Sequence, residues 1–100
     1  MASAGFAPIT HTQRIELKAI PSGQGLEFVE AELFLRPEIP FAIIFYSDNG
    51  IRQEDGMRMD LDKQIFLDHF EDQAREDIAT AAAPAILDQI FDFFETHPPL

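Results

Sequence analysis

The sequence predicts an α+β domain: an antiparallel meander of about four strands, followed by one kinked helix or two helices packed on one sheet face. Three observations predict this fold. Apolar and polar residues alternate with a period of two over much of residues 14–61, turn sequences separate these runs, and residues from about 70 onward follow a helical period. The length of 100 residues fits a single domain over residues 1–100, and we expect residues 1–10 to form a flexible N-terminal tail.

The first two strands form a hairpin. Residues 14–20 (RIELKAI) alternate strictly, residues 21–25 (PSGQG) predict the turn, and residues 26–36 (LEFVEAELFLR) supply the second strand. Odd-numbered residues should pair with odd-numbered ones, which also brings basic residues of the first strand beside acidic residues of the second. In the second strand the alternation assigns one set to the core face, Val29, Ala31, Leu33 and Leu35, and the other to the opposite face, Phe28, Glu30, Glu32 and Phe34.

The middle of the chain predicts an interior strand and its return. Residues 41–46 (FAIIFY) are apolar throughout, which is typical of a strand covered on both faces. Asn49-Gly50 predicts a tight hairpin, because both central positions of such a turn need a positive φ angle. Residues 51–61 supply the returning strand, with a disruption near residues 54–56, and residues 62–68 are compatible with either a strand extension or a helix start.

The last third of the chain predicts helix. Residues 85–95 (AILDQIFDFFE) carry a broad apolar stripe and an acidic stripe at helical spacing. Pro84 removes a backbone donor and disfavours the helical conformation of the residue before it, so the helix should kink or break there. The apolar stripe continues upstream through Phe70, Ala74, Ile78, Ala81 and Ala82.

Composition excludes several classes of function. The chain has 18 acidic and 7 basic residues, so its formal net charge of −11 disfavours direct nucleic-acid binding and contact with anionic membranes. It has no cysteine, which removes disulfides, thiolate nucleophiles and zinc-thiolate sites. We find no signal peptide and no segment of membrane-spanning length, and we expect a cytoplasmic protein.

Residues 60–71 (DLDKQIFLDHFE) come closest to a known metal motif. Their Asp, Gln and Glu side chains fall at ligand positions of a calcium-binding loop. The sixth position of such a loop needs a positive φ angle, however, and the β-branched Ile65 stands there. His69, Asp72 and Glu76 could share a helix face, but a histidine among carboxylates is expected by chance on so acidic a surface. The sequence therefore predicts no metal site and no cofactor.

Polar residues near the second hairpin are the remaining candidates for a small-molecule site. They define a possible polar pocket formed by Tyr46, Asp48, Glu54 and His69. The requirements of the turn explain most of the same residues, and the serines lack the glycines of a nucleophile elbow. We therefore assign no catalytic residue, and enzymatic activity stays an alternative.

A second apolar sheet face carries the functional prediction. Opposite the helix-covered face lie Phe28, Phe34 and one of two sets, either Phe41, Ile43 and Phe45 or Ala42, Ile44 and Tyr46. Such a patch on a small domain indicates a partner surface or a ligand cavity. We favour a small acidic, non-catalytic interaction or regulatory domain that acts as a homodimer, with Phe28 and Phe34 at the interface.

Two other classes of function remain open. One is a ligand-binding or enzymatic domain with a pocket between sheet and helix. The other is an acidic mimic of nucleic acid that occupies a basic groove on a protein partner, suggested by the net charge and by the stripe of Asp88, Asp92 and Glu95.

Overall fold

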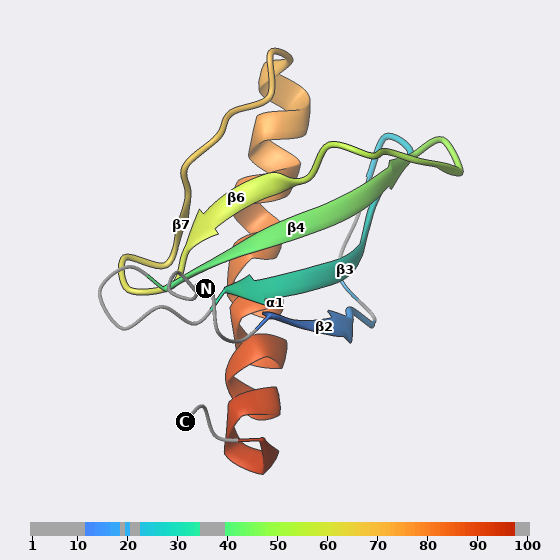
Figure 1. The fold of residues 1–100 in the computed structure, drawn as a ribbon. Coiled ribbons are helices and arrows are strands. Elements are labelled where there is room, and N and C mark those ends of the chain that lie inside the picture. Colours follow the sequence, from blue (N-terminus) through green and yellow to red (C-terminus); the bar gives the residue numbers. More distant parts are fainter. Residues whose placement is uncertain (1–11, 19, 21–22, 35–39, 98–100) are drawn as a thin grey trace, which may run out of the picture.

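The computed structural model describes residues 12–18, 20, 23–34 and 40–97 (Figure 1). An antiparallel sheet has the strand order β2-β3-β4-β6-β7, with β5 paired to β4, and a single helix follows it. The α+β prediction is confirmed, and the predicted tail at residues 1–10 lies outside the described residues. The elements are β2 (Thr12–Glu16), β3 (Leu26–Phe34), β4 (Phe41–Asp48), β5 (Ile51–Arg52), β6 (Met57–Asp60), β7 (Ile65–Phe66) and α1 (Gln73–Thr96).

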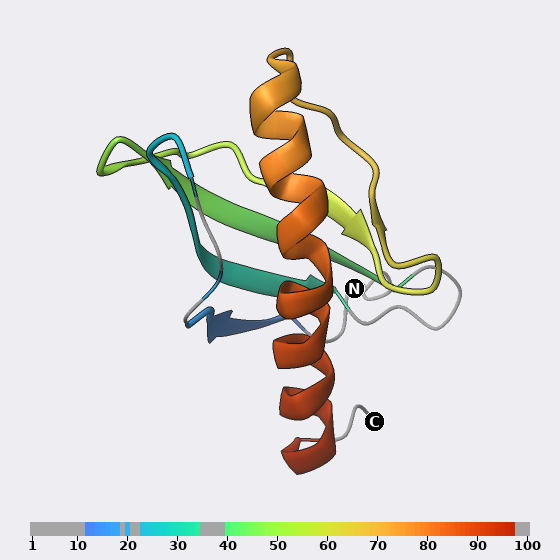
Figure 2. The same cartoon turned by 180° about the vertical axis from the view of Figure 1, so that it is seen from behind.

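Helix α1 crosses one face of the sheet, as the view from behind shows (Figure 2). We call this covered face the inner face and the opposite one the outer face. Alanines let the helix backbone approach the sheet closely, and larger aliphatic side chains fill the space farther along. The buried helix residues are Ala79, Ala82, Ala83, Ile86, Leu87 and Ile90, and the buried strand residues include Leu26, Ala31, Leu33, Ala42, Ile44, Met57 and Met59.

The pairing of β2 with β3 follows the predicted register. Ile15 lies opposite Ala31, and the Leu17 amide continues the ladder by donating to the Val29 carbonyl at 3.0 Å. Odd residues thus pair with odd residues, as predicted. Beyond the paired strand, the side-chain amide of Gln89 donates to the backbone carbonyl of Lys18 and accepts from its N–H at 2.9 Å. The helix therefore holds the backbone that follows β2.

A bulge in β3 reverses the faces of its first residues. Phe28 lies opposite Tyr46 and Glu30 opposite Phe45, so Val29 has no partner in β4. The extra residue shifts the alternation, and Phe28 lies on the inner face with 2% of its surface exposed. The prediction that Phe28 points away from the core is wrong, and its side chain is buried where a partner could not reach it. Phe34, beyond the bulge, lies on the outer face.

Strand β4 is the central strand, as its apolar sequence predicts. Ala42 and Ile44 are fully buried on the inner face. The outer face therefore carries the first of the two sets left open by the sequence, Phe41, Ile43 and Phe45, all partly buried. The Asn49-Gly50 turn has φ angles of 53° and 84°, as predicted.

The return from this hairpin is interrupted, also as predicted. Residues 53–56 separate β5 from β6. A Cβ atom on Gly56 would lie 2.3 Å from Cγ2 of Ile43, so only glycine fits there without displacing the outer-face side chains. The interruption therefore brings the backbone at Gly56 against the side chains of β4.

Residues 61–72 resolve an ambiguity in the sequence. A turn over residues 61–64 leads into β7, which pairs with β6 through Met59 opposite Phe66. Residues 62–68 are thus partly a strand extension and not a helix start. The helix begins later, where the Asp72 carboxylate caps it by accepting from the Ala74 amide at 2.9 Å.

Helix α1 continues through Pro84 without a break, so the two-helix alternative is wrong. The predicted apolar stripe is correct at Ile86, Leu87 and Ile90, but Ala81 is exposed and Ala79 is buried in its place. Among the described residues, no helix is long and apolar enough to cross a membrane.

Candidate binding surfaces

An ion pair joins the end of β4 to the first turns of α1. The Arg75 guanidinium binds both carboxylate oxygens of Asp48, with 2.9 Å between Nη2 and Oδ1. The hydrogen bonds from Arg75 hold the pKa of Asp48 below its ordinary value. Next to this pair, the Tyr46 ring packs edge-on against Phe70, with ring centroids 5.4 Å apart. Burial, with a smaller contribution from the Asp48 charge, raises the pKa of Tyr46, so its hydroxyl stays protonated at neutral pH and can donate a hydrogen bond.

A hollow of about 590 Å³ lies beside Tyr46 and Arg75. The structure brings two of the four predicted pocket residues, Tyr46 and His69, to this hollow. Asp48 binds Arg75, which lines it, whereas Glu54 does not line it and Asp55 does. The complete lining is Tyr46, Asp55, Gly56, Met57, Asp68, His69, Phe70, Glu71, Asp72 and Arg75.

His69 lines both this hollow and a second one, and it contacts Glu76, which lines the second. Their side chains are 3.1 Å apart, and Glu76 also accepts from the Phe70 amide at 2.8 Å. The Phe70 hydrogen bond, followed by that of His69, lowers the pKa of Glu76. His69 and Asp72 precede the helix, so the predicted shared helix face is wrong, although His69 and Glu76 do meet.

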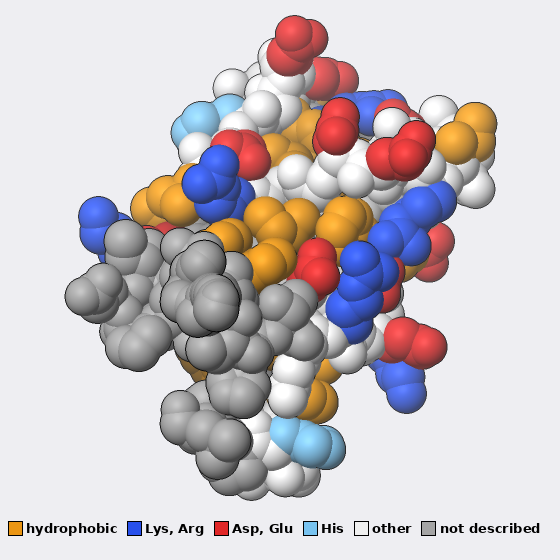
Figure 3. All heavy atoms as spheres, in the orientation of Figure 1, with side chains coloured by type: hydrophobic (Ala, Val, Ile, Leu, Met, Phe, Trp, Pro, Cys, Tyr) orange, Lys and Arg blue, Asp and Glu red, His pale blue; other side chains and the backbone are white. Residues whose placement is uncertain are grey.

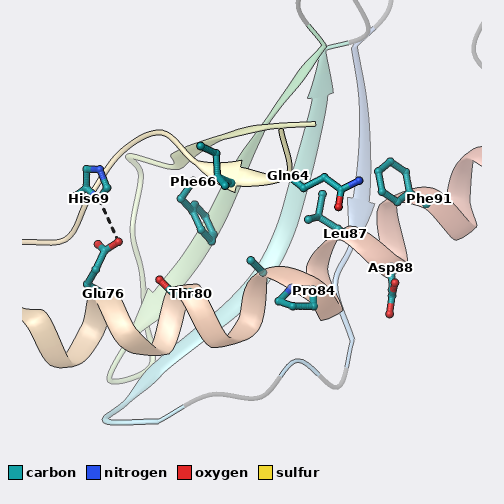
Figure 4. A pocket seen from close by; sticks show the side chains of 11 residues that line it. Gln64, Phe66, His69, Glu76, Thr80, Pro84, Leu87, Asp88 and Phe91 are labelled. Atoms are coloured by element: carbon teal, nitrogen blue, oxygen red, sulfur yellow. Dashed lines mark hydrogen bonds and ion pairs between the residues drawn. The ribbon is translucent and has the colours of Figure 1, made fainter. Parts of the chain in front are cut away.

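The second hollow is an apolar groove of about 680 Å³ between residues 64–69 and α1 (Figure 4). We call it the β7–α1 groove. Gln64 lies near its Phe91 end and His69 at its Glu76 end, so the strand segment and the helix form its two walls. Two of its apolar side chains are unusually exposed, Ile65 at 49% and Phe91 at 37%. Its lining is Gln64, Ile65, Phe66, His69, Glu76, Thr80, Ala83, Pro84, Leu87, Asp88 and Phe91.

The outer sheet face carries a third candidate surface. We call Phe34, Phe41, Ile43 and Phe45 the outer-face patch. The Phe34 and Phe41 rings stack at 4.7 Å between centroids, and the Phe45 ring lies beneath two guanidinium groups, Arg14 at 5.5 Å and Arg52 at 4.9 Å. Figure 3 shows hydrophobic side chains gathered across this face, with basic and acidic side chains along the border.

The residues that suggested a calcium loop have local roles. Asp60 accepts from the Lys63 amide at 2.6 Å, and Asp68 accepts from the Arg58 amide at 3.0 Å. The positive φ angle falls on Gln64, at 61°, and Ile65 is in a strand. In the part of the chain that the structure describes, no group of three His, Cys, Asp or Glu side chains is arranged to hold a metal ion.

Sequence reasoning missed Arg75 and the β7–α1 groove. Arg75 is the only basic residue after Lys63, and this isolation in an acidic helix was the signal available in the sequence. The groove had no comparable signal, because it depends on the path of residues 61–72. Comparisons with protein-family models, curated proteins and solved structures find no match to this chain, so its own geometry carries the functional interpretation.

The Asp48–Arg75 pair makes stability sensitive to acid. Because the pKa of Asp48 is lower in the folded chain than in the unfolded one, its stabilising contribution is present above about pH 4, the ordinary range of aspartate, and is lost as the pH falls through the folded value. We expect Asp48→Asn to be less stable than the wild type at neutral pH, with a difference that shrinks on acidification. Urea unfolding at several pH values measures it, and a difference that grows toward low pH would contradict this assignment.

Proposed function

We propose that the protein is a non-catalytic interaction or regulatory domain that acts as a homodimer through its outer-face patch. The carrying observation is that this patch is apolar and partly exposed on the face opposite α1, and that no described element packs over it. Apolar patches bordered by polar residues are typical of protein interfaces. The cytoplasmic location expected from the sequence belongs to the same proposal.

Charges around the patch support pairing with an identical surface. Arg14 contacts Glu30 at 3.4 Å and Glu32 at 3.6 Å, and Arg52 contacts Glu30 at 2.7 Å. Both signs thus lie on one face, so a twofold mate would present acidic groups to the arginines and basic groups to the glutamates. A patch with charges of one sign would instead repel its own copy.

The apolar surface of the outer-face patch is consistent with a dimer of moderate affinity. Complete burial of a large apolar side chain is worth about 1.5–3 kcal/mol, and the patch residues are already partly buried, so each gains roughly half of that. The four patch residues of both protomers together contribute about 6–12 kcal/mol. Association costs about 4 kcal/mol or more, so the net gain is at most about 8 kcal/mol, which corresponds to a dissociation constant of about 1 μM or weaker.

Sedimentation equilibrium tests the proposal. We expect the wild type to have the mass of a dimer at about 50 μM in about 0.15 M salt, where surface charges are screened. The double change Phe34→Ser with Ile43→Ser should give a monomer, because it removes apolar surface from the outer face and leaves the inner-face core intact. Circular dichroism should show the same secondary structure in both proteins.

Ile51→Ser is the matched control. Ile51 is 68% exposed near the tip of the β4–β5 hairpin and is not part of the patch, so this change removes exposed apolar surface elsewhere. The control should remain dimeric. A monomeric wild type, or a double variant that still dimerises, would exclude the outer-face dimer, and a pocket function at the Tyr46 hollow would then become the leading alternative.

A further inference from the structure

The β7–α1 groove has the shape of a site for an extended chain. Its helix wall runs from Glu76 to Phe91 through residues that share one side of α1. Fifteen residues of helix span roughly 22 Å at about 1.5 Å each. An extended segment of about seven residues has the same length, at about 3.3 Å per residue. On the opposite wall, residues 64–69, Ile65 and Phe66 are strand and lie between the turn at Gln64 and a bend at residues 67–68 (Figure 4).

The strand wall offers backbone hydrogen bonds. The Leu67 amide donates to the Arg58 carbonyl of β6 at 2.8 Å. Backbone groups of successive strand residues point to opposite sides, so Phe66 directs its N–H and C=O away from β6. Strand β7 is the last strand of the sheet, and within the described residues neither group of Phe66 has a partner. An added strand could pair with them, which is a recurring mode of peptide recognition.

The helix wall offers a further acceptor. A helical carbonyl normally accepts from the N–H four residues later, but Pro84 has no N–H, so the Thr80 carbonyl lacks this donor. Thr80 and Pro84 both line the groove and are both exposed. A proline inside an exposed stretch of helix is costly, and here it leaves a backbone acceptor beside an apolar channel.

The charges that line the groove favour a basic partner segment. Glu76 and Asp88 line it, and none of its lining residues is Lys or Arg. The whole chain carries a formal charge of −11. An acidic segment would be repelled, and a purely apolar one would leave these carboxylates and the Thr80 carbonyl without new partners. Basic side chains would satisfy both.

We propose that the β7–α1 groove binds an extended segment of a partner protein whose groove-facing residues, every second residue along the segment, are in turn aliphatic and Lys or Arg. Its backbone pairs with Phe66 as an added strand. Successive side chains of a strand point to opposite faces, so only these residues enter the groove, where the aliphatic ones lie against Leu87 and Phe91 and the basic ones meet Glu76 and Asp88. This site is separate from the outer-face patch and does not rest on the proposed dimer.

The probe is a labelled octapeptide in which every second residue is in turn Ile and Lys, with Thr between them; we call it the Lys–Ile peptide. Fluorescence anisotropy should show saturable binding, and the Glu–Ile counterpart, with Glu in place of Lys, should bind at least about tenfold more weakly. Hydrogen exchange measured by NMR should show slower exchange of the Phe66 amide when the Lys–Ile peptide is present, because that N–H gains an acceptor. The Phe66 readout distinguishes an added strand from a cationic peptide that adheres to the acidic surface.

Two pairs of variants locate the site on α1. Thr80→Trp fills the groove, whereas Ala81→Trp places the same side chain on the next exposed helix position, which does not line it. We expect the first to weaken binding at least about tenfold and the second to leave it unchanged. Asp88→Asn should weaken Lys–Ile binding more than Asp92→Asn does, and these exposed changes do not threaten the core.

Several outcomes would overturn the proposal. They are equal binding of the Lys–Ile and Glu–Ile peptides, no change in Phe66 exchange, or equal effects of the two Trp variants. Protection of Phe66 that rises with protein concentration in the absence of peptide would make a second copy the occupant. The double variant Phe34→Ser with Ile43→Ser should bind the peptide as the wild type does, so failure of the dimer proposal and failure of this one are distinguishable.

Discussion

Phe28→Ala is expected to lower the free energy of unfolding by about 3–5 kcal/mol, the usual cost of truncating a buried aromatic ring. Phe28 is 2% exposed, and its ring lies 6.4 Å from those of both Tyr46 and Phe66. The truncation would leave a cavity beside the β3 bulge and the rings of Tyr46 in β4 and Phe66 in β7. Urea unfolding followed by circular dichroism measures the loss.

Phe91→Ala is the control for this experiment. The chemical change is identical, but Phe91 is 37% exposed on α1, so we expect a clearly smaller loss. The comparison tests the bulge directly. If Phe28 instead pointed outward, as simple alternation predicts, its truncation would cost little and the two variants would behave alike.

Pro84→Ala is expected to act in the opposite direction and to raise the free energy of unfolding by about 2–3 kcal/mol. Proline inside a helix costs about 3 kcal/mol relative to alanine, because it removes a hydrogen bond and crowds the preceding turn. Pro84 is exposed, so its ring contributes little burial that alanine would lose. Urea unfolding again provides the measurement.

Thr80→Ala, one turn earlier, is the matched control. It replaces another exposed residue of the groove by alanine, improves helix propensity by only a few tenths of a kcal/mol, and restores no hydrogen bond. A Pro84→Ala protein that is less stable than the wild type would show that the ring packs better in the groove than its exposure indicates. A Pro84→Ala protein that is more stable than the wild type but binds the Lys–Ile peptide less well would indicate that Pro84 lowers stability and strengthens binding.

Much of the sheet could be predicted, because alternation and turn residues are local signals. The Asn49-Gly50 hairpin, the interior position of residues 41–46 and the interruption near Gly56 all follow from residues close together in the sequence. The register of β2 on β3 follows because only one parity places both apolar sets on the same face.

The bulge was readable in principle, but strict alternation concealed it. Leu26 and Phe28 are apolar at even positions, and Ala31 and Leu33 are apolar at odd positions. The adjacent apolar pair Phe28 and Val29 marks the point where the phase changes. Strict alternation, with odd-numbered residues on the core face back through Val29, assigns Phe28 to the wrong face of the sheet.

The candidate surfaces also differ in how far the sequence predicts them. The outer-face patch could be predicted in part, since strand alternation places Phe34 there but leaves two sets open for residues 41–46 and wrongly adds Phe28. The β7–α1 groove could not, because it forms where a turn with a positive φ angle at Gln64 returns the chain beside a helix more than ten residues later. Two elements whose separation is set by a loop leave no periodic signal in the sequence.

The contact of Gln89 with Lys18 has a consequence for aggregation. An open sheet exposes two edges, and copies that join edge to edge can in principle polymerise without limit. Gln89 occupies the outward backbone groups of Lys18, and Arg14 and Glu16 place charge on the exposed strand before it. The β2 edge is therefore protected, whereas within residues 12–18, 20, 23–34 and 40–97 no comparable contact covers the β7 edge. A fibre grows only if each copy pairs through both of its edges. Because one edge is protected, edge-to-edge pairing stops after one partner has been added, which favours closed complexes over fibres.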